Sequence, residues 1–122
     1  MLAIGVDLIE VNRIEIAAAR YGERFLSRVF TALELAYCRG HSHQLAARFA
    51  AKEAASKALG TGIQHPDGVG WQEIQIVSDE RGKPTLQLTG RAAERAEHLG
   101  LMNFTVSLSH TLEHAIAMVI AE

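Results

Sequence analysis

An alanine-rich stretch from Arg48 to Gly62, RFAAKEAASKALGTG, constrains the fold of this chain most strongly. Its alanines favour a helix, and Gly60 stands where a glycine commonly follows a helix C-terminus. At about 100° per residue, Phe49, Glu53 and Lys57 share one face of that helix. Alanine side chains are short and let neighbouring backbone come close, so we expect this helix at the centre of the fold.

Glu53 and Lys57 place a carboxylate and an ammonium one helical turn apart, just before a Gly-Thr-Gly segment. Such a pair could hold a metal ion and a phosphate together. It could equally be an ordinary surface pair that stabilises the helix by ~0.3–0.5 kcal/mol. The pair alone does not decide between these interpretations.

Residues 2–9 alternate as in a β-strand, with an apolar side formed by Leu2, Ile4, Val6 and Leu8. This pattern predicts a half-buried strand that carries Asp7 on the side opposite the apolar one. Gly5 leaves space beside Asp7 on that side. Asp7 is a candidate functional acid, and the alternative is an N-cap of the next helix, with Glu10 as its capping-box partner.

Four arginines follow within sixteen residues, in and after a predicted helix over residues 10–21 that ends at Gly22. Arg13 and Arg20 share the outer face of this helix, and Arg24 and Arg28 extend the positive charge beyond it. A solvated helix face would explain them. A docking surface for an acidic partner would explain them as well, since arginine pairs with carboxylates in bidentate fashion.

The remaining pattern predicts an α+β fold. Thr31 and Glu34 form a capping box that opens a short helix, Ser42 is a candidate cap for the central helix, and His41 and His43 are interpreted as loop histidines. Residues 60–70 are rich in turn formers. Strands over 71–77 and 85–89 form a hairpin, a helix covers 90–100, and two final strands cover 104–108 and 115–120. We therefore expect one compact domain over residues 1–122, with an antiparallel sheet packed against the alanine-rich helix.

Composition limits the class of protein. The net charge of −2 argues against bulk nucleic-acid binding, and no apolar run approaches the ~18 residues of a membrane span. No secretory signal is evident. Cys38 is the single cysteine, so no internal disulfide is expected and a reducing cytoplasmic location is predicted.

The order of these motifs resembles a known family. The resemblance rests on the segments IGVDLIEVNRI, RFAAKEAASKALGTGI, WQEIQI, GKP and VSLSH, which together span nearly the whole chain. The chain is similar to the holo-acyl-carrier-protein synthases, the small bacterial 4′-phosphopantetheinyl transferases. One departure is Ala3, where the family commonly has a second glycine.

The resemblance implies a transferase of fatty acid biosynthesis that moves 4′-phosphopantetheine from coenzyme A to a serine of acyl carrier protein, with adenosine 3′,5′-bisphosphate as the second product and Mg²⁺ as cofactor. It also implies a homotrimer with active sites between subunits. Asp7 and Glu53 match the family's metal ligands, and with Lys57 they are the expected catalytic residues. The positions that match coenzyme A-binding residues are Arg48, Lys57, Gly82, Lys83, Pro84 and His110. The positions that match the carrier-protein docking face are Arg13, Arg20 and Arg24.

Two other classes stay open at this point. A different Mg²⁺-dependent phosphoryl-group enzyme or nucleotide hydrolase would use the same carboxylates with water as acceptor, although the chain has no P-loop sequence. A non-catalytic interaction module would use the arginines as its binding face, with Asp7 as a cap and Glu53 in a surface pair.

Overall fold

The computed structural model describes all 122 residues, 1–122. Its elements follow in the order β1 (Ala3–Glu10), α1 (Val11–Tyr21), α2 (Glu23–Val29), α3 (Ala32–Cys38), α4 (Ser42–Ala58), a 3₁₀ turn (Trp71–Glu73), β2 (Ile74–Ser78), β3 (Pro84–Leu88), α5 (Gly90–Leu99), β4 (Phe104–His110) and β5 (His114–Ala121). None of the helices is long and apolar enough to cross a membrane.

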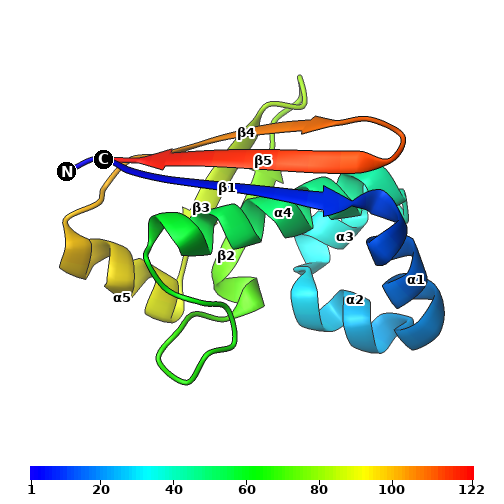
Figure 1. Cartoon of the computed structure of the whole chain (residues 1–122), viewed down its shortest axis with the longest axis horizontal. Helices are drawn as coiled ribbons and strands as arrows, with labels where there is room; N and C mark the ends of the chain where they lie inside the picture. Colours follow the sequence, from blue (N-terminus) through cyan, green and yellow to red (C-terminus); the bar gives the residue numbers. More distant parts are fainter.

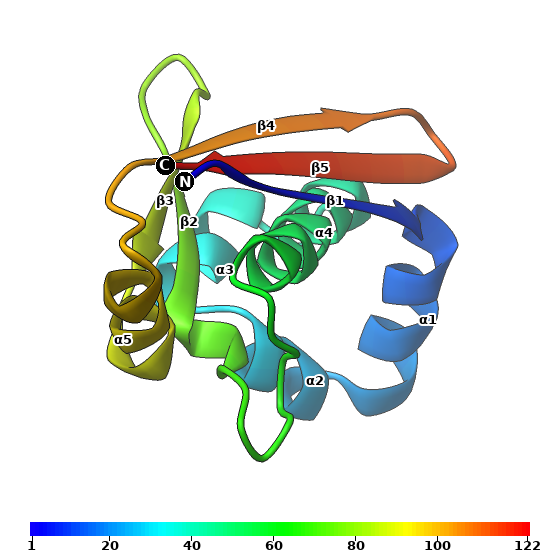
Figure 2. The same ribbon diagram turned by 60° about the vertical axis from the view of Figure 1, so that its left-hand side comes forward.

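An antiparallel sheet lies along one side of α4, as the sequence predicted, and its strands stand in the order β1-β5-β4 (Figure 1). The β2–β3 hairpin forms a second, two-stranded antiparallel sheet. Figure 2 shows α4 nearly end-on, enclosed by the three-stranded sheet, the hairpin and the N-terminal helices. The fold is therefore the α+β arrangement expected from the sequence, with the alanine-rich helix at its centre.

Alanine makes this enclosure possible. Ala46, Ala50, Ala51, Ala54 and Ala55 are all fully buried, and α4 therefore packs against several elements at once. The helix ends as predicted. Gly60 has φ of 68°, and the N–H groups of Gly60 and Thr61 donate to the carbonyls of Lys57 and Ser56. These two hydrogen bonds form the Schellman motif, which satisfies the last carbonyl groups of a helix.

The predicted burial of β1 is wrong. The apolar side of the strand is exposed, with Leu2, Ile4, Val6 and Leu8 at 46–69%. Asp7 lies on the opposite side of the strand, which faces α4 and contains the buried residue Gly5. The alternation itself was interpreted correctly, but α4 covers the side that carries glycine and the acid.

Further expectations need correction. The predicted strand over 71–77 begins with a 3₁₀ turn, Trp71–Glu73, and only Ile74–Ser78 forms β2. A helix that the sequence analysis did not predict, α2, follows Gly22 directly and carries Arg24 and Arg28. Ser42 is the first residue of α4 rather than its cap, because His41 precedes the helix and gives no side-chain cap. His43 is a helical residue, not a loop residue. The capping box of Thr31 and Glu34 is confirmed.

Candidate functional site

Asp7 and Lys57 meet between β1 and α4. Nζ of Lys57 lies 3.1 Å from Oδ1 of Asp7 and donates to the carbonyl oxygen of Val6 at 2.9 Å. The Lys57 side chain is 54% exposed and that of Asp7 is 18% exposed. Asp7 is therefore not the N-cap of α1. Glu10 occupies that position, and its side chain makes no capping hydrogen bond. More than half of the Lys57 side chain is open to solvent, so an anion from solution can reach its ammonium group.

Glu53 completes a cluster of two acids and one lysine. It lies one turn before Lys57 on the part of α4 that is not buried. Burial raises the pKa of the Glu53 carboxyl group, the nearby charge of Asp7 raises it further, and Lys57 and Arg13 act in the opposite direction. Like-charged carboxylates that face each other across a partly dry site favour a bound cation or proton.

Arg13 is close enough to this cluster for its charge to act on Glu53. It lies on α1 and is exposed, as are Arg20 on α1 and Arg24 on α2. The three predicted docking residues thus remain on the surface, and one of them borders the acidic cluster. Arg28 differs, because its guanidinium donates to Oε1 of Gln64 at 3.0 Å.

Arg48 lies in the first half of α4, five residues before Glu53, and it is only 3% exposed. Its guanidinium donates to Oε1 of Gln44 at 2.7 Å and to Oγ of Ser78 at 2.8 Å, and it lies 4.6 Å from the ring centroid of Tyr37. Its Nε is buried without a hydrogen-bond partner. The arginine thus joins α4 to the end of β2, where the next turn begins.

That turn contains the predicted residues Gly82, Lys83 and Pro84. Oδ1 of Asp79 accepts hydrogen bonds from the N–H groups of Arg81 at 2.8 Å and Lys83 at 2.9 Å, which fixes the shape of the turn. Gly82 has φ of 83°, and a Cβ there would lie 3.6 Å from Oη of Tyr37. The turn and the Arg48 group therefore share Tyr37 as a neighbour.

His110 ends β4 and is exposed. Its ring centroid lies 4.6 Å from that of His43, and the His43 ring stacks on His41 at 5.8 Å. His110 alone had a predicted binding role, and His41 and His43 were interpreted as loop histidines. Their position beside β4 depends on the fold, not on any local spacing.

A buried ion pair that no local sequence signal predicts lies next to the candidate site. Nζ of Lys52 lies 2.8 Å from Oε1 of Glu34, and both side chains are fully buried. Lys52 also donates to the carbonyls of Ile74 and Trp71 at 2.6 and 3.0 Å, and Glu34 accepts from the N–H of Ile76 at 2.8 Å. This pair ties α3, α4 and the start of β2 together, directly beside Glu53 in the sequence.

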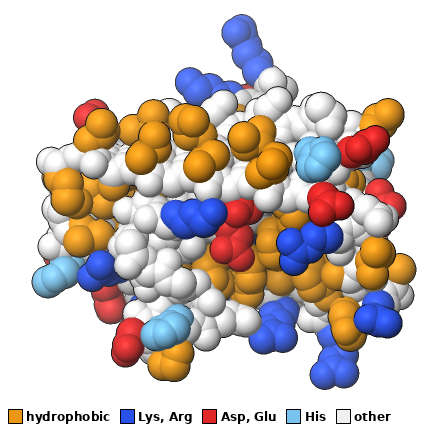
Figure 3. Space-filling model, in the orientation of Figure 1, with side chains coloured by type: hydrophobic (Ala, Val, Ile, Leu, Met, Phe, Trp, Pro, Cys, Tyr) orange, Lys and Arg blue, Asp and Glu red, His pale blue; other side chains and the backbone are white.

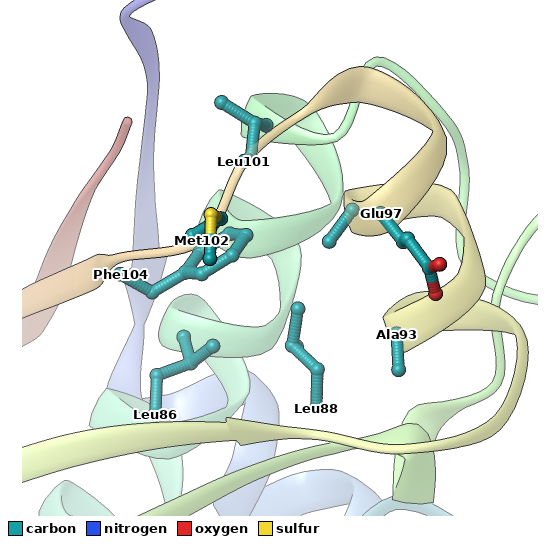
Figure 4. Close-up of a pocket in the computed structure, with 8 residues that line it drawn as sticks. Leu86, Leu88, Ala93, Glu97, Leu101, Met102 and Phe104 are labelled. Atoms are coloured by element: carbon teal, nitrogen blue, oxygen red, sulfur yellow. The ribbon is translucent and has the colours of Figure 1, made fainter.

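A cavity of about 360 Å³ between β3, α5 and the start of β4 contains none of the predicted residues (Figure 4). Hydrophobic side chains line it, among them Leu86, Leu88 and Phe104, with Glu97 as its one charged residue. An apolar lining with a carboxylate does not suit a phosphate-bearing substrate. The candidate site is therefore the group around Asp7, Glu53 and Lys57.

Comparisons with known proteins identify the family of this chain. Residues 3–119 match the family described as the 4′-phosphopantetheinyl transferase superfamily. The holo-[acyl-carrier-protein] synthases of Herpetosiphon aurantiacus and Chloroflexus aurantiacus are 51% and 48% identical to the chain. The alignments cover 98% and 99% of this chain and 98% of each relative.

Solved structures show the same fold. The holo-[acyl-carrier-protein] synthase of Helicobacter pylori in complex with coenzyme A has a TM-score of 0.87 and 31% identity, covering 98% of this chain and 99% of that one. The enzyme of Neisseria meningitidis has a TM-score of 0.86 and 33% identity, covering 98% and 97%. This chain therefore belongs to the 4′-phosphopantetheinyl transferase superfamily and, within it, to the holo-[acyl-carrier-protein] synthase family.

Proposed function

We propose that this chain transfers 4′-phosphopantetheine from coenzyme A to a serine of apo-acyl carrier protein, releases adenosine 3′,5′-bisphosphate, and requires Mg²⁺. The observation that carries the proposal is the convergence of Asp7 from β1 with Glu53 and Lys57 from α4, in a chain of this family. The synthases it matches are named for this reaction, and the similar Helicobacter pylori structure contains coenzyme A.

The residues fit a magnesium ion. Asp7 and Glu53 offer two carboxylates, the hard oxygen ligands that Mg²⁺ prefers, and they leave room for phosphate and water ligands. Burial and the charge of Asp7 raise the pKa of Glu53, and a cation bound by both carboxylates would relieve the repulsion between them. Bound there, Mg²⁺ would orient the pyrophosphate and neutralise charge on the leaving phosphate.

The reaction is a displacement at phosphorus. The serine oxygen bonds to the β-phosphorus of coenzyme A, the bond from that phosphorus to the bridging oxygen breaks, and the serine proton passes to a base. Lys57 can move its ammonium from Asp7 to the oxygens that gain charge on the leaving group. The base is a carboxylate of the cluster or a water held by it.

We also propose that the chain acts as a homotrimer with active sites between subunits. The outward side of the sheet carries exposed apolar side chains from β1 and β5, at 39–63% exposure: Ile4, Val6, Leu8, Ile116, Met118 and Ile120. Figure 3 shows hydrophobic side chains along the upper part of the molecule, over the strands. A contiguous apolar surface of this kind is typical of a subunit interface. Light scattering tests the assembly, and a fully active monomer would contradict it.

Further parts of the proposal concern partners and location. Arg13, Arg20 and Arg24 remain exposed and would dock an acidic carrier protein of fatty acid biosynthesis. Arg48, Gly82, Lys83, Pro84 and His110 would contact coenzyme A. A cytoplasmic location is compatible with Cys38, which is a free, buried thiol.

Mass spectrometry of an apo-carrier protein, incubated with this chain, coenzyme A and Mg²⁺, tests the function. We expect a mass gain of one phosphopantetheine and an equal amount of adenosine 3′,5′-bisphosphate. Release of the bisphosphate without a carrier protein would indicate a hydrolase instead. Metal-dependent binding of coenzyme A without any turnover would indicate a binding module.

A further inference from the structure

A polar cavity of about 400 Å³ lies between α5 and the loop that follows α4. The charged and hydrogen-bonding side chains that line it are Thr61 and Asp67 from the loop and Arg91, Glu94, Arg95 and His98 from α5. The four helical residues stand at positions i, i+3, i+4 and i+7, so they share one face of α5. The volume falls within the ~300–1,000 Å³ that is usual for small-molecule sites.

The charged groups of this cavity have no counterions within the protein. The two ion pairs of the chain join Lys52 to Glu34 and Lys57 to Asp7, and neither involves a residue of the cavity. Two guanidinium groups and two carboxylates therefore line one space with balanced charge, but without pairing to one another. Such a lining attracts a ligand that itself carries both signs of charge more than it attracts a simple anion or cation.

The guanidinium of Arg95 is held in a defined position. Its Nε donates to the carbonyl oxygen of Leu59 at 3.0 Å, and its Nη2 lies 3.6 Å from the point where a Cβ atom on Gly60 would stand. The side chain is half-buried, and its two Nη groups donate to no protein acceptor. The free end of the guanidinium is the fork that binds a carboxylate through two parallel hydrogen bonds.

Asp67 supplies a negative charge to the same space. Its backbone is fixed, because its N–H donates to Nδ1 of His65 at 3.2 Å and its carbonyl oxygen accepts from Oγ1 of Thr61 at 3.5 Å. Its carboxylate accepts no hydrogen bond from the protein. Asp67 and Arg95 also line a second, adjoining cavity of about 370 Å³. An open carboxylate and an open guanidinium thus border the same polar space.

We propose that this cavity binds a small zwitterion that carries a carboxylate and an ammonium group, which is the chemistry of an α-amino acid. The ligand carboxylate pairs with the fork of Arg95, and its ammonium group pairs with Asp67 and Glu94. Thr61 and His98 offer hydrogen bonds to the remainder of the ligand. None of these residues is assigned to the metal, coenzyme A or the carrier protein, so the inference does not depend on the proposed function.

Two-dimensional ¹H–¹⁵N NMR of the whole chain tests the proposal. The standard amino acids are the probes, and propionate, ethylamine and inorganic phosphate are the single-charge controls. We expect at least one amino acid to shift the amide signals of residues 61–69 and 91–98 in a saturable manner. Propionate and ethylamine should bind at least about tenfold more weakly, because each lacks one charge-assisted hydrogen-bonding group. Phosphate should also bind more weakly, because the two acids of the cavity repel it.

Two variants test the assigned partners. Asp67→Asn changes an exposed loop residue and should weaken amino-acid binding at least about tenfold with an unchanged melting temperature. Arg95→Gln should weaken binding as much, although it also removes the bond to Leu59. Glu97→Gln is the matched control, because this exposed acid of α5 faces the apolar cavity instead and its loss should leave binding unchanged.

Three results would overturn the proposal. The first is the absence of a saturable shift with any amino acid. The second is an Asp67→Asn variant that binds amino acids as the parent does. The third is phosphate or propionate that binds as tightly as the best amino acid, which would make the cavity a site for anions alone. Activity of the chain towards a carrier protein plays no part in these measurements, so their failure leaves the proposed function untouched.

Discussion

Gly5 of β1 lies so close to Ala54 of α4 that a Cβ atom on the glycine would overlap the Ala54 carbonyl oxygen. The same atom would lie 2.9 Å from the backbone nitrogen of Ala58. Strand and helix backbones are therefore in direct contact, which only glycine on one side and alanine on the other permit. Asp7, two residues along the same side of β1, reaches Lys57 because of this contact.

Gly5→Ala should therefore damage both stability and activity. The added methyl meets backbone atoms that cannot rotate away, so β1 must move and carry Asp7 with it. We expect a loss of about 1–3 kcal/mol in the free energy of unfolding, measured by urea denaturation, together with reduced transfer. Gly62→Ala is the control, because its Cβ would make an ordinary contact with Cβ of His65 at 3.5 Å. Equal stability of the two variants would contradict the close approach.

The two acids should be necessary for activity and dispensable for folding. Asp7→Asn and Glu53→Gln each remove one of the two carboxylates that would hold Mg²⁺, so transfer should fall at least ~100-fold. Melting temperatures should change little, because neither side chain caps a helix. Glu10→Gln, at the exposed N-cap of α1, should keep full activity. Mass spectrometry of the carrier protein gives the activity, and an active Asp7→Asn would exclude the metal site.

The local sequence signals predicted much of this structure. Gly60 was recognised as a helix terminator and Thr31–Glu34 as a capping box, because both features depend on residues only a few positions apart. Alternation predicted the strands, and the alanines predicted the central place of α4. The short helix α2 escaped prediction, since its seven residues follow a glycine and carry mixed charges with no clear apolar stripe.

Signals that depend on the fold were missed or misinterpreted. The apolar side of β1 predicted burial in its own chain, but glycine and alanine let α4 cover the other side. The sequence gives no sign that Lys52 is buried. Its charge is buried at an acceptable free-energy cost because Glu34 of α3 pairs with it. His43 gains its neighbour His110 from a strand more than sixty residues away. The periodicity of hydrophobic residues cannot predict contacts between residues that are so far apart in the sequence.

The buried pair of Lys52 and Glu34 should contribute strongly to stability. Burial lowers the pKa of Lys52, and the Glu34 carboxylate acts against this shift. Lys52→Met would leave the Glu34 charge buried without its counterion, at a cost of about 3–5 kcal/mol. Lys57→Met removes a half-exposed partner and should cost less than about 1 kcal/mol. Urea denaturation of both variants separates a buried pair from an exposed one, and equal losses would contradict this interpretation.

The thiol of Cys38 should be unreactive in the folded protein. Burial raises its pKa to about 11, with Arg48 acting in the opposite direction. Because the thiolate is the reactive form, the fraction available at pH 8 is negligible while the chain is folded, and it increases on unfolding, where the pKa is lower. Alkylation by iodoacetamide at pH 8 should therefore follow the urea unfolding curve. Rapid alkylation without urea would show that α3 opens locally.

The exposed docking residues Arg13, Arg20 and Arg24 should set the affinity for the carrier protein. We expect the carrier-protein partner to be acidic, and this chain has a net charge of −2, so a productive encounter needs a local positive patch. Arg13→Glu should raise KM for the carrier protein at least ~tenfold, because it replaces attraction with repulsion. Coenzyme A affinity should stay nearly constant, and added salt should weaken carrier-protein binding more in the parent than in the variant. Arg91→Glu, an exposed change of equal charge on α5, controls for net charge.

Arg13 also acts electrostatically on Glu53, so its two roles need to be separated. Arg13→Gln removes the positive charge beside Glu53 without adding a negative one, and it should raise KM less than Arg13→Glu does. If both variants instead lower kcat equally and leave KM for the carrier protein unchanged, Arg13 serves the acidic cluster and not the docking surface. Arg20 and Arg24 lie further along the same positive stretch, so their glutamate variants should then still raise KM, because docking would rest on them.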